Sequence, residues 1–204
     1  MLDKNFFNRD TLCVAKDLLG KIIVRKTHSH IYKAMVVETE GYLGIEDRAC
    51  HTFGGRKTER NKIMYEDAGT IYVYQTYGIH YLMNFVTLDK SNPEAVLIRA
   101  VEPIEGINQM SINRFRKNYT DLNKYQKNNL TNGPGKFTKA LDIDKSLNGR
   151  NLFGAQIYLI DGDKDFEIET DVRIWIDYAK EAKDYPYRFY IKDNLYVSKF
   201  KRWA

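Results

Sequence analysis

The chain has 204 residues, of which 43% are hydrophobic, with a net charge of +5 and a pI near 9.0. This length allows one domain with a sizeable core, and the basic balance favours an anionic partner. Two cysteines, Cys13 and Cys50, exclude a disulfide framework and lack metal-ligand spacing. The charged N-terminus differs from a signal peptide, and no stretch reaches the roughly 20 apolar residues of a membrane span. We therefore expect a cytoplasmic protein without a membrane partner.

The first 42 residues predict a helix followed by two strands. Apolar residues recur at helical spacing before Gly20, a residue type that commonly ends helices. The expected buried positions are Leu12, Ala15, Leu18 and Leu19, and the expected N-cap is Asp10 or Thr11. Residues 21–26 and 32–42 then read as strands, with a polar turn through His28 and His30 between them.

The second of these strands carries two glutamates and a tyrosine on one face. Residues two apart in an extended strand point to the same side, so Glu38, Glu40 and Tyr42 are expected to lie together. A carboxylate beside an aromatic ring suits a site that holds a flat substrate next to a general base. The pattern also fits a solvated strand face, and the spacing does not choose between the two glutamates.

A loop rich in glycine and charge is expected over residues 44–69. Within it, the segment 54–62 has four cations and one acid, Glu59, and its two glycines allow the backbone to approach a ligand closely. Arg56 and Arg60 suit phosphate groups, although a solvated surface loop has the same composition. His51 is of interest only because this basic segment follows it.

The stretch GTIYVYQTYGIHYLMN, residues 69–84, predicts a β-hairpin with an aromatic residue at its tip. Tyr72 and Tyr74 share one strand face, whereas Tyr77 and Gly78 fall at the turn. The exposure of an aromatic ring to water at a hairpin tip is unfavourable unless a partner buries the ring. An opened base step in DNA is such a partner, because an aromatic side chain can fill the gap between the bases. The alternative is that Tyr77 folds back onto its own domain.

An apolar strand over residues 95–101 and a helix are expected next. Pro103 is expected to open this helix, because proline is tolerated in a first turn. The apolar residues of the helix would be Ile104, Ile107, Met110 and Ile112. Residues 113–132 are basic and poor in aliphatic residues, so they form either a loop or a marginal helix.

A second helix is expected from about Pro134. The sequence GPGK places backbone amides and Lys136 at its N-terminus, which is a favourable position for an anion. Residues 155–200 then predict strands with a short break near residues 180–186. This mixture of helices, strands and hairpins indicates the α+β class.

One acidic motif begins like a calcium-binding loop but does not meet its requirements. Asp161, Asp163 and Asp165 match ligand positions, whereas Phe166 replaces the glycine at position six and Val172 the glutamate at position twelve. The alternating acids therefore predict a solvent-facing strand, and no metal site is expected. The sequence also lacks dinucleotide fingerprints and P-loops.

Five blocks of the sequence are informative when taken together: VVETEGYLGIEDRACH, GGRKTERN, GTIYVYQTYGIHYLMN, VLIRAVEP and NGPGKFTKAL. In this order they resemble the alkyladenine (3-methyladenine) DNA glycosylase family, over about Phe7 to Ser198. The resemblance implies one mixed α+β glycosylase domain over residues 1–204, with a curved antiparallel sheet and a protruding β-hairpin. It also implies base excision repair without a cofactor, by hydrolysis of the N-glycosidic bond of alkylated or deaminated purines.

The resemblance assigns roles in the chemistry and the base pocket. Glu40, rather than Glu38, corresponds to the family's general base, and Arg99 to the arginine that holds the attacking water with it. The residues that match those sandwiching the extruded base are Tyr42, His51 and Tyr74. Asn84 matches the residue that crowds the 2-amino group of guanine. The implied substrates are 3-methyladenine, hypoxanthine and ethenoadenine.

The resemblance also assigns contacts with duplex DNA that contains a damaged purine. Tyr77 matches the side chain that fills the vacated base stack, with Ile79 and His80 beside it in the groove. Arg56 and Arg60 lie where the family contacts phosphates. No lysine matches a Schiff-base nucleophile, so the enzyme is expected to be monofunctional and to act as a monomer, in the cytoplasm or at the bacterial nucleoid.

Two departures from the family's pattern bear on activity. Glu59 stands where the family usually has proline, and Trp175 stands where the family has glycine. Ile174 matches the residue whose carbonyl helps to hold the water, so the neighbouring indole either reshapes the pocket or faces outward. Two other functions stay open: a non-catalytic protein of the same fold that binds damaged DNA or RNA, and an unrelated RNA-binding module that stacks bases on its aromatic residues.

Overall fold

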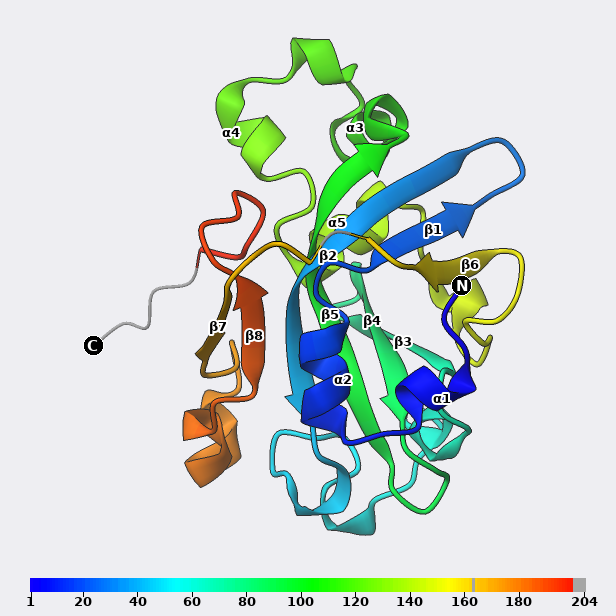
Figure 1. Cartoon of the computed structure of the whole chain (residues 1–204), viewed down its shortest axis with the longest axis vertical. Helices are drawn as coiled ribbons and strands as arrows, with labels where there is room; N and C mark the ends of the chain where they lie inside the picture. The colour runs from blue at the N-terminus through cyan, green and yellow to red at the C-terminus, as the bar shows by residue number, and fades with distance from the viewer. Residues whose placement is uncertain (163, 200–204) are drawn as a thin grey trace.

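Paired antiparallel strands form the framework of the protein (Figure 1). The structure is a computed structural model, and it describes residues 1–162 and 164–199. The strands are β1 (Ile22–Lys26), β2 (Ile31–Tyr42), β3 (Ile71–Thr76), β4 (His80–Thr87), β5 (Glu94–Glu105), β6 (Ile157–Ile160), β7 (Ile168–Asp171) and β8 (Arg188–Ile191). They form one sheet in the order β3-β4-β5-β2-β1-β6, with β8 beside β2 and β7 beyond β8.

Short helices cover this sheet and connect its strands. They are α1 (Lys4–Phe7), α2 (Thr11–Asp17), α3 (Ile107–Phe115), α4 (Lys124–Asn128) and α5 (Pro134–Ala140), with 3₁₀ segments that include η1 (Gly44–Glu46), η2 (Phe53–Gly55), η3 (Lys62–Tyr65) and η6 (Asp177–Asp184). Asp10 caps α2 by accepting a 2.8 Å hydrogen bond from the Cys13 N–H, as the sequence predicts.

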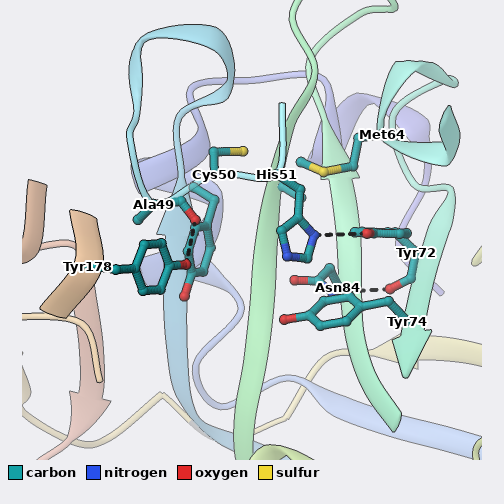
Figure 2. Close-up of a pocket in the computed structure, with 10 residues that line it drawn as sticks. Ala49, Cys50, His51, Met64, Tyr72, Tyr74, Asn84 and Tyr178 are labelled. Carbon is teal, nitrogen blue, oxygen red and sulfur yellow. Dashed lines mark hydrogen bonds between the residues drawn. The ribbon is translucent and has the colours of Figure 1, made fainter. Parts of the chain in front are cut away.

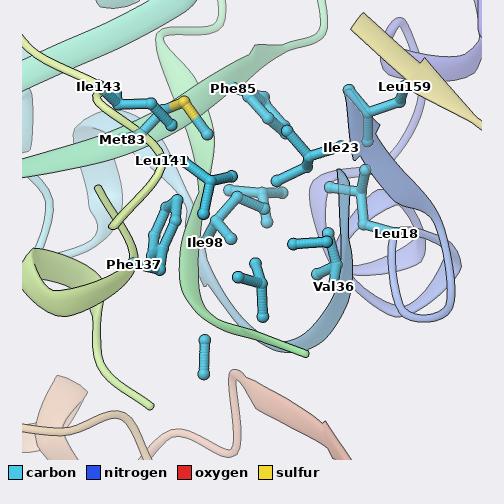
Figure 3. Close-up of a cluster of buried hydrophobic side chains, with 14 of the residues drawn as sticks. Leu18, Ile23, Val36, Met83, Phe85, Ile98, Phe137, Leu141, Ile143 and Leu159 are labelled. Atoms are coloured by element: carbon cyan, nitrogen blue, oxygen red, sulfur yellow. The ribbon is translucent and has the colours of Figure 1, made fainter. Parts of the chain in front are cut away.

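The hydrophobic core lies between the curved sheet and helices α2 and α5 (Figure 3). Leu18 follows α2 and packs in the same buried cluster as Phe137 of α5 and Ile98 of β5. These side chains are fully buried, and burying each contributes about 1.5–3 kcal/mol of hydrophobic free energy. The core fixes β5 and β2, which are the two strands that carry the candidate catalytic residues.

Strand β2 changes neighbour along its length. Residues 31–35 pair with β1, whereas residues 38–40 pair with β8, and β5 pairs with both parts on the other side. The register against β5 is irregular around Val36 and Glu38, which is the kind of bulge that redirects side chains near active sites. Glu38 and Glu40 therefore lie on a strand enclosed by β5 and β8.

The expectation that Pro103 opens a helix is wrong. β5 continues through Pro103, which lies opposite Ala34 of β2, and α3 begins only at Ile107. Proline is tolerated near the end of a strand where its missing N–H is not needed. The turn is made instead by Gly106, whose φ of 79° is unfavourable for other residues, and a Cβ there would lie 2.7 Å from the Ile31 carbonyl oxygen.

The C-terminal prediction is partly wrong. Strands β6, β7 and β8 lie where strands were expected, and η6 fills the predicted break. Residues 192–199 form turns rather than a strand, and Tyr196 and Val197 pack against the core. Phe200, which ends the expected strand, and Asp163 of the acidic motif lie outside the described residues.

The expectation that the alternating acids form a solvent-facing strand is also wrong, because β6 ends at Ile160 and β7 begins only at Ile168, which leaves Asp161 and Asp165 between the two strands. The predictions for the middle of the chain agree with the structure. α5 begins at Pro134, and residues 113–132 contain the end of α3 and the short α4, whose N-terminus is closed by a capping box of Asn123 and Gln126. The α+β class, with a curved antiparallel sheet and a protruding β3–β4 hairpin, is confirmed.

Candidate active site

A cavity lies where β2, β3 and β4 meet the loop after β2 and the segment η6. Its lining side chains are Tyr42, Ala49, Cys50, His51, Met64, Tyr72, Tyr74, Asn84, Ala95 and Tyr178. Its volume of about 40 Å³ is well below the roughly 300–1,000 Å³ of most small-molecule sites, so a ligand the size of a purine requires its walls to move apart. Figure 2 shows Tyr178 on one side and His51 and Tyr74 on the other. The structure thus brings together all four predicted pocket residues, including Tyr42 and Asn84.

His51 is held as a neutral ring in the wall of this cavity. Its Nδ1 lies 2.9 Å from the hydroxyl oxygen of Tyr72, and its ring meets Tyr74 edge to face with 4.7 Å between centroids. Burial, aided by the positive charge of Arg60, lowers the pKa of His51 to about 4. The imidazole is therefore uncharged near neutral pH, which suits contact with a flat ring.

Glu40 is fully buried, and three groups contact its carboxylate. The Tyr42 hydroxyl donates to Oε2 at 2.8 Å, and the Ile174 N–H donates to Oε1 at 2.8 Å. Arg99 Nη1 lies 3.2 Å from the same Oε1. Tyr42 lines the cavity and Glu40 does not, so the carboxylate lies behind Tyr42 with its direction fixed by these contacts.

Arg99 joins the two glutamates of β2. Its Nε donates to Oε1 of Glu38 at 3.2 Å while its Nη1 approaches Glu40. Burial opposes the charge of this guanidinium, but the two carboxylates outweigh burial and raise the pKa of Arg99. Glu38 and Glu40 thus share one side of β2 as predicted, and their burial shows that the alternative of a solvated strand face is wrong.

One wall of the cavity depends on a buried ion pair between distant segments. Arg173 donates from both terminal nitrogens to Asp47, and its guanidinium lies 4.8 Å from the centroid of the Tyr42 ring. Arg48 and Glu181 form a second, exposed ion pair between the same two segments at 2.7 Å. These contacts hold η6, with Tyr178, against the loop that follows β2.

The hairpin tip projects away from the protein. Tyr77 and Gly78 have positive φ values of 50° and 70°, and they lie within the turn that the Ile79 N–H closes on the Thr76 carbonyl oxygen at 3.3 Å. Tyr77 is 91% exposed and Ile79 is 72% exposed, so the alternative that Tyr77 folds back onto its domain is wrong. His80 is also exposed, but its ring rests near Gly135, where a Cβ would lie 2.9 Å from His80 Cγ.

The three predicted phosphate-binding cations differ in how they are held. Arg56 and Arg60 are exposed on the loop after β2, and the Arg60 guanidinium lies 5.2 Å from the centroid of the Tyr74 ring. Lys136 is partly buried and donates from Nζ to the side-chain oxygens of Asn129 and Asn132, both at 2.8 Å. Burial lowers the pKa of Lys136. The two arginines are thus more accessible to an anion than the lysine.

Comparison with known proteins identifies the family. The family model described as methylpurine-DNA glycosylase (MPG) matches residues 5–195. This chain belongs to the methylpurine-DNA glycosylase family. A relative from Clostridium novyi (strain NT) is 54% identical over 198 residues, covering 97% of this chain and 98% of the relative. Relatives from Desulfitobacterium hafniense (strain Y51) and Clostridium perfringens (strain SM101 / Type A) are 52% and 48% identical with the same coverage. Each is named "Putative 3-methyladenine DNA glycosylase".

Trp175 adopts a backbone conformation that favours glycine. Its φ of 62° lies in the left-handed region, which explains why a glycine is expected here from the family's pattern. The indole is 70% exposed and does not line the cavity, so it faces outward rather than reshaping the pocket. Ile174 before it is buried, with its N–H on Glu40. Glu59, the other departure, is exposed and pairs with Lys62 at 2.7 Å.

Sequence reasoning missed several residues that line the cavity. Tyr72 shares a strand face with Tyr74, so the hairpin pattern contained a signal for it. Tyr178, Cys50 and Met64 come from 3₁₀ segments and loops that have no periodic pattern. Tyr178 reaches the cavity only through contacts between segments about 126 residues apart, such as Arg173 with Asp47, which local sequence does not reveal.

Over residues 1–162 and 164–199, no three His, Cys, Asp or Glu side chains are grouped closely enough to hold a metal ion. Among these same residues, every helix is too short or too polar to cross a membrane.

Proposed function

We propose that this chain is a monofunctional 3-methyladenine DNA glycosylase that removes damaged purines from duplex DNA. The proposal places the whole chain, residues 1–204, in one glycosylase domain that acts as a monomer in the cytoplasm or at the nucleoid. Membership of the methylpurine-DNA glycosylase family supports it. The observation that carries it is the ion pair of Glu40 and Arg99 behind the wall of an aromatic cavity.

The hairpin tip would stabilise the extruded state of the damaged nucleotide. A base inside a duplex is inaccessible to water, and unstacking it costs a few kcal/mol, least for a damaged or mispaired base. Tyr77 and Ile79 are largely exposed at the tip, so neither side chain has to leave a packed position before it enters the base stack. Stacking of one aromatic side chain on a base contributes about 1–3 kcal/mol, which offsets much of that cost.

The aromatic cavity would then hold the extruded purine. Tyr42, His51 and Tyr74 present ring surfaces, and the low pKa of His51, about 4, keeps its imidazole from repelling a cationic methylated base. Aromatic faces attract such a cation more than a neutral purine. Asn84 is buried with its Nδ2 on the Tyr72 carbonyl at 3.1 Å, so it would reject the 2-amino group of guanine by steric exclusion.

Glu40 would activate the water that attacks the sugar. The carboxylate accepts a proton from water as the water oxygen bonds to the anomeric carbon, and the electron pair of the C–N bond leaves with the purine. The charge of Glu40 also stabilises the oxocarbenium-like transition state. Arg99 and the Ile174 carbonyl would hold the water. The water would contact Oε2 of Glu40, the oxygen that also accepts the hydrogen bond from the Tyr42 hydroxyl. Hypoxanthine, a neutral leaving group, needs a proton and would depart more slowly.

A direct assay tests this proposal. The chain is incubated with DNA methylated by a chemical agent, and with duplex oligonucleotides that contain hypoxanthine or ethenoadenine, and the free bases are separated by chromatography. We expect release of 3-methyladenine and no covalent adduct after treatment with borohydride. Tight binding of methylated DNA without release of any base would contradict the proposal and support the non-catalytic alternative. Preferential binding of single-stranded RNA would support the RNA-binding alternative.

A further inference from the structure

Glu38 is a buried strand residue whose carboxylate accepts hydrogen bonds from three other residues. It is fully buried, and its Oε1 accepts from Arg99 Nε at 3.2 Å and from Arg188 Nε at 2.7 Å. Its Oε2 accepts from the Ser198 N–H at 2.8 Å. One carboxylate therefore holds two guanidinium groups, and one of these is the arginine that contacts Glu40.

Arg99 is held at two separate points along its guanidinium. Glu38 takes Nε and Glu40 takes Nη1, so the plane of the group is fixed between two carboxylates that lie two residues apart on β2. With one carboxylate alone, the guanidinium could rotate about its side-chain bonds and change the contact made by Nη1. Planar, two-point recognition of this kind is the geometry for which arginine is suited.

Arg188 balances the charge that this arrangement buries. Two carboxylates and two guanidiniums give a formal charge of zero for Glu38, Glu40, Arg99 and Arg188, all within 5% exposure. Arg188 extends from β8, which pairs with β2 at Glu38 and Glu40, and its Nη1 reaches the half-exposed Asp171 at 3.1 Å. The second guanidinium thus gives the second buried carboxylate an ion-pair partner of its own.

We infer that Glu38 is a positioning residue for base release, which orients Arg99 so that its Nη1 fixes Glu40 and the attacking water. The inference rests on the proposed glycosylase function. Glu38 does not line the cavity, so its effect passes through Arg99 rather than through contact with the purine. Glu38 therefore affects the rate of the chemical step and not the affinity for damaged DNA.

Three variants separate positioning from folding. Glu38→Gln removes the ionic hold on Arg99 and takes from Arg188 its buried carboxylate partner, which leaves it with the half-exposed Asp171. Glu38→Gln/Arg188→Gln removes both charges, so it restores charge balance without restoring the hold on Arg99. Asp171→Asn removes the other carboxylate that Arg188 contacts and leaves Glu38 in place. Each is compared with the unaltered protein by melting temperature, affinity for a hypoxanthine duplex and the rate of base release at saturating enzyme.

We expect Glu38→Gln to lower both the melting temperature and the release rate. The double variant should recover most of the melting temperature but remain slower by roughly 10- to 100-fold, the scale on which partners that orient a reacting group affect activity. The affinity of the double variant for the duplex should stay within about twofold of the affinity of the unaltered protein. The release rate of Asp171→Asn should likewise stay within about twofold of the unaltered rate. Because the double variant is charge-balanced, it carries the test if Glu38→Gln does not fold.

The inference is overturned if the double variant recovers its release rate together with its melting temperature, because Glu38 would then serve only the fold. A loss of rate in Asp171→Asn as large as in the double variant would overturn it as well. Failure of the unaltered protein to release any base would instead contradict the proposed function, and the two failures are therefore distinguishable.

Discussion

The hairpin tip and the charged cluster behind the cavity (Glu38, Glu40, Arg99 and Arg188) place their candidate functional side chains in opposite environments. Tyr77 is 91% exposed at the tip, whereas Glu38 and Glu40 are fully buried. The tip depends on two adjacent residues with positive φ, but the ion pairs of the cluster join residues 59 to 150 positions apart. Function should therefore be separable from stability at the tip and coupled to it in the cluster.

The largest effect on stability is expected from Arg99→Met. This change leaves Glu38 and Glu40 buried together without the guanidinium between them, and breaking a buried ion pair in this way costs about 3–5 kcal/mol in free energy of unfolding. Urea denaturation measures the loss. Arg48→Met, which removes an exposed ion pair with Glu181, is the control and should cost about 1 kcal/mol or less. Equal losses would remove the contrast between buried and exposed regions.

His51 lies in the cavity wall, and its protonation should weaken the protein in acid. Its pKa is about 4 in the folded state against 6.5 in the unfolded state, so the unfolded chain binds more protons below pH 6.5. The stabilising contribution is complete above pH 6.5 and is lost as the pH falls towards 4. The loss is on the order of 3 kcal/mol.

Thermal unfolding at several pH values checks this expectation. His51→Asn should be less sensitive than the unaltered protein between pH 6.5 and 4. His28→Asn, at an exposed histidine, should behave like the unaltered protein. An unchanged acid sensitivity in His51→Asn would show that the ring is not held neutral by its surroundings.

Tyr77→Ala should impair base extrusion without affecting stability. Loss of one stacked ring removes about 1–3 kcal/mol of stabilisation from the extruded state. The release rate at low enzyme concentration should therefore fall roughly 5- to 150-fold, because each 1.4 kcal/mol or so corresponds to a tenfold change in rate. The free energy of unfolding should change by less than about 0.5 kcal/mol because the ring is exposed. Ethenoadenine fluorescence reports extrusion, and Tyr125→Ala, at an exposed tyrosine of α4, is the control. A destabilised Tyr77→Ala protein with normal extrusion would reverse the comparison.

The smallest effect is expected at Trp175, beside the charged cluster. A left-handed conformation costs a residue with a Cβ roughly 1–2 kcal/mol. Trp175→Gly should therefore be more stable than Trp175→Ala by about 1 kcal/mol, since both lack the indole and only the backbone differs. Chemical denaturation of the two variants measures the difference, and equal stabilities would show that φ is not constrained here.

Local patterns were sufficient to predict the elements whose cause is local. The hairpin followed from alternation around Tyr77 and Gly78, and α2 followed from its cap and Gly20. The prediction of a helix at Pro103 was wrong because proline is tolerated both in a first helical turn and near the end of a strand. The pairing of Pro103 with Ala34 of β2 places it in a strand. Spacing placed Glu38 and Glu40 on one face but could not distinguish their roles, because their partners come from β5, β8 and the segment around Ile174. Tyr178 was unpredictable for the same reason.

The most direct test of the central claim separates chemistry from binding in one experiment. Base release and ethenoadenine fluorescence are measured for Glu40→Gln and for Glu46→Gln, an exposed glutamate of η1. The account predicts that Glu40→Gln binds and extrudes the lesion but releases base about 10²- to 10⁴-fold more slowly, the range for loss of a general base, while Glu46→Gln is unaffected. Release by Glu40→Gln at the unaltered rate would contradict the account.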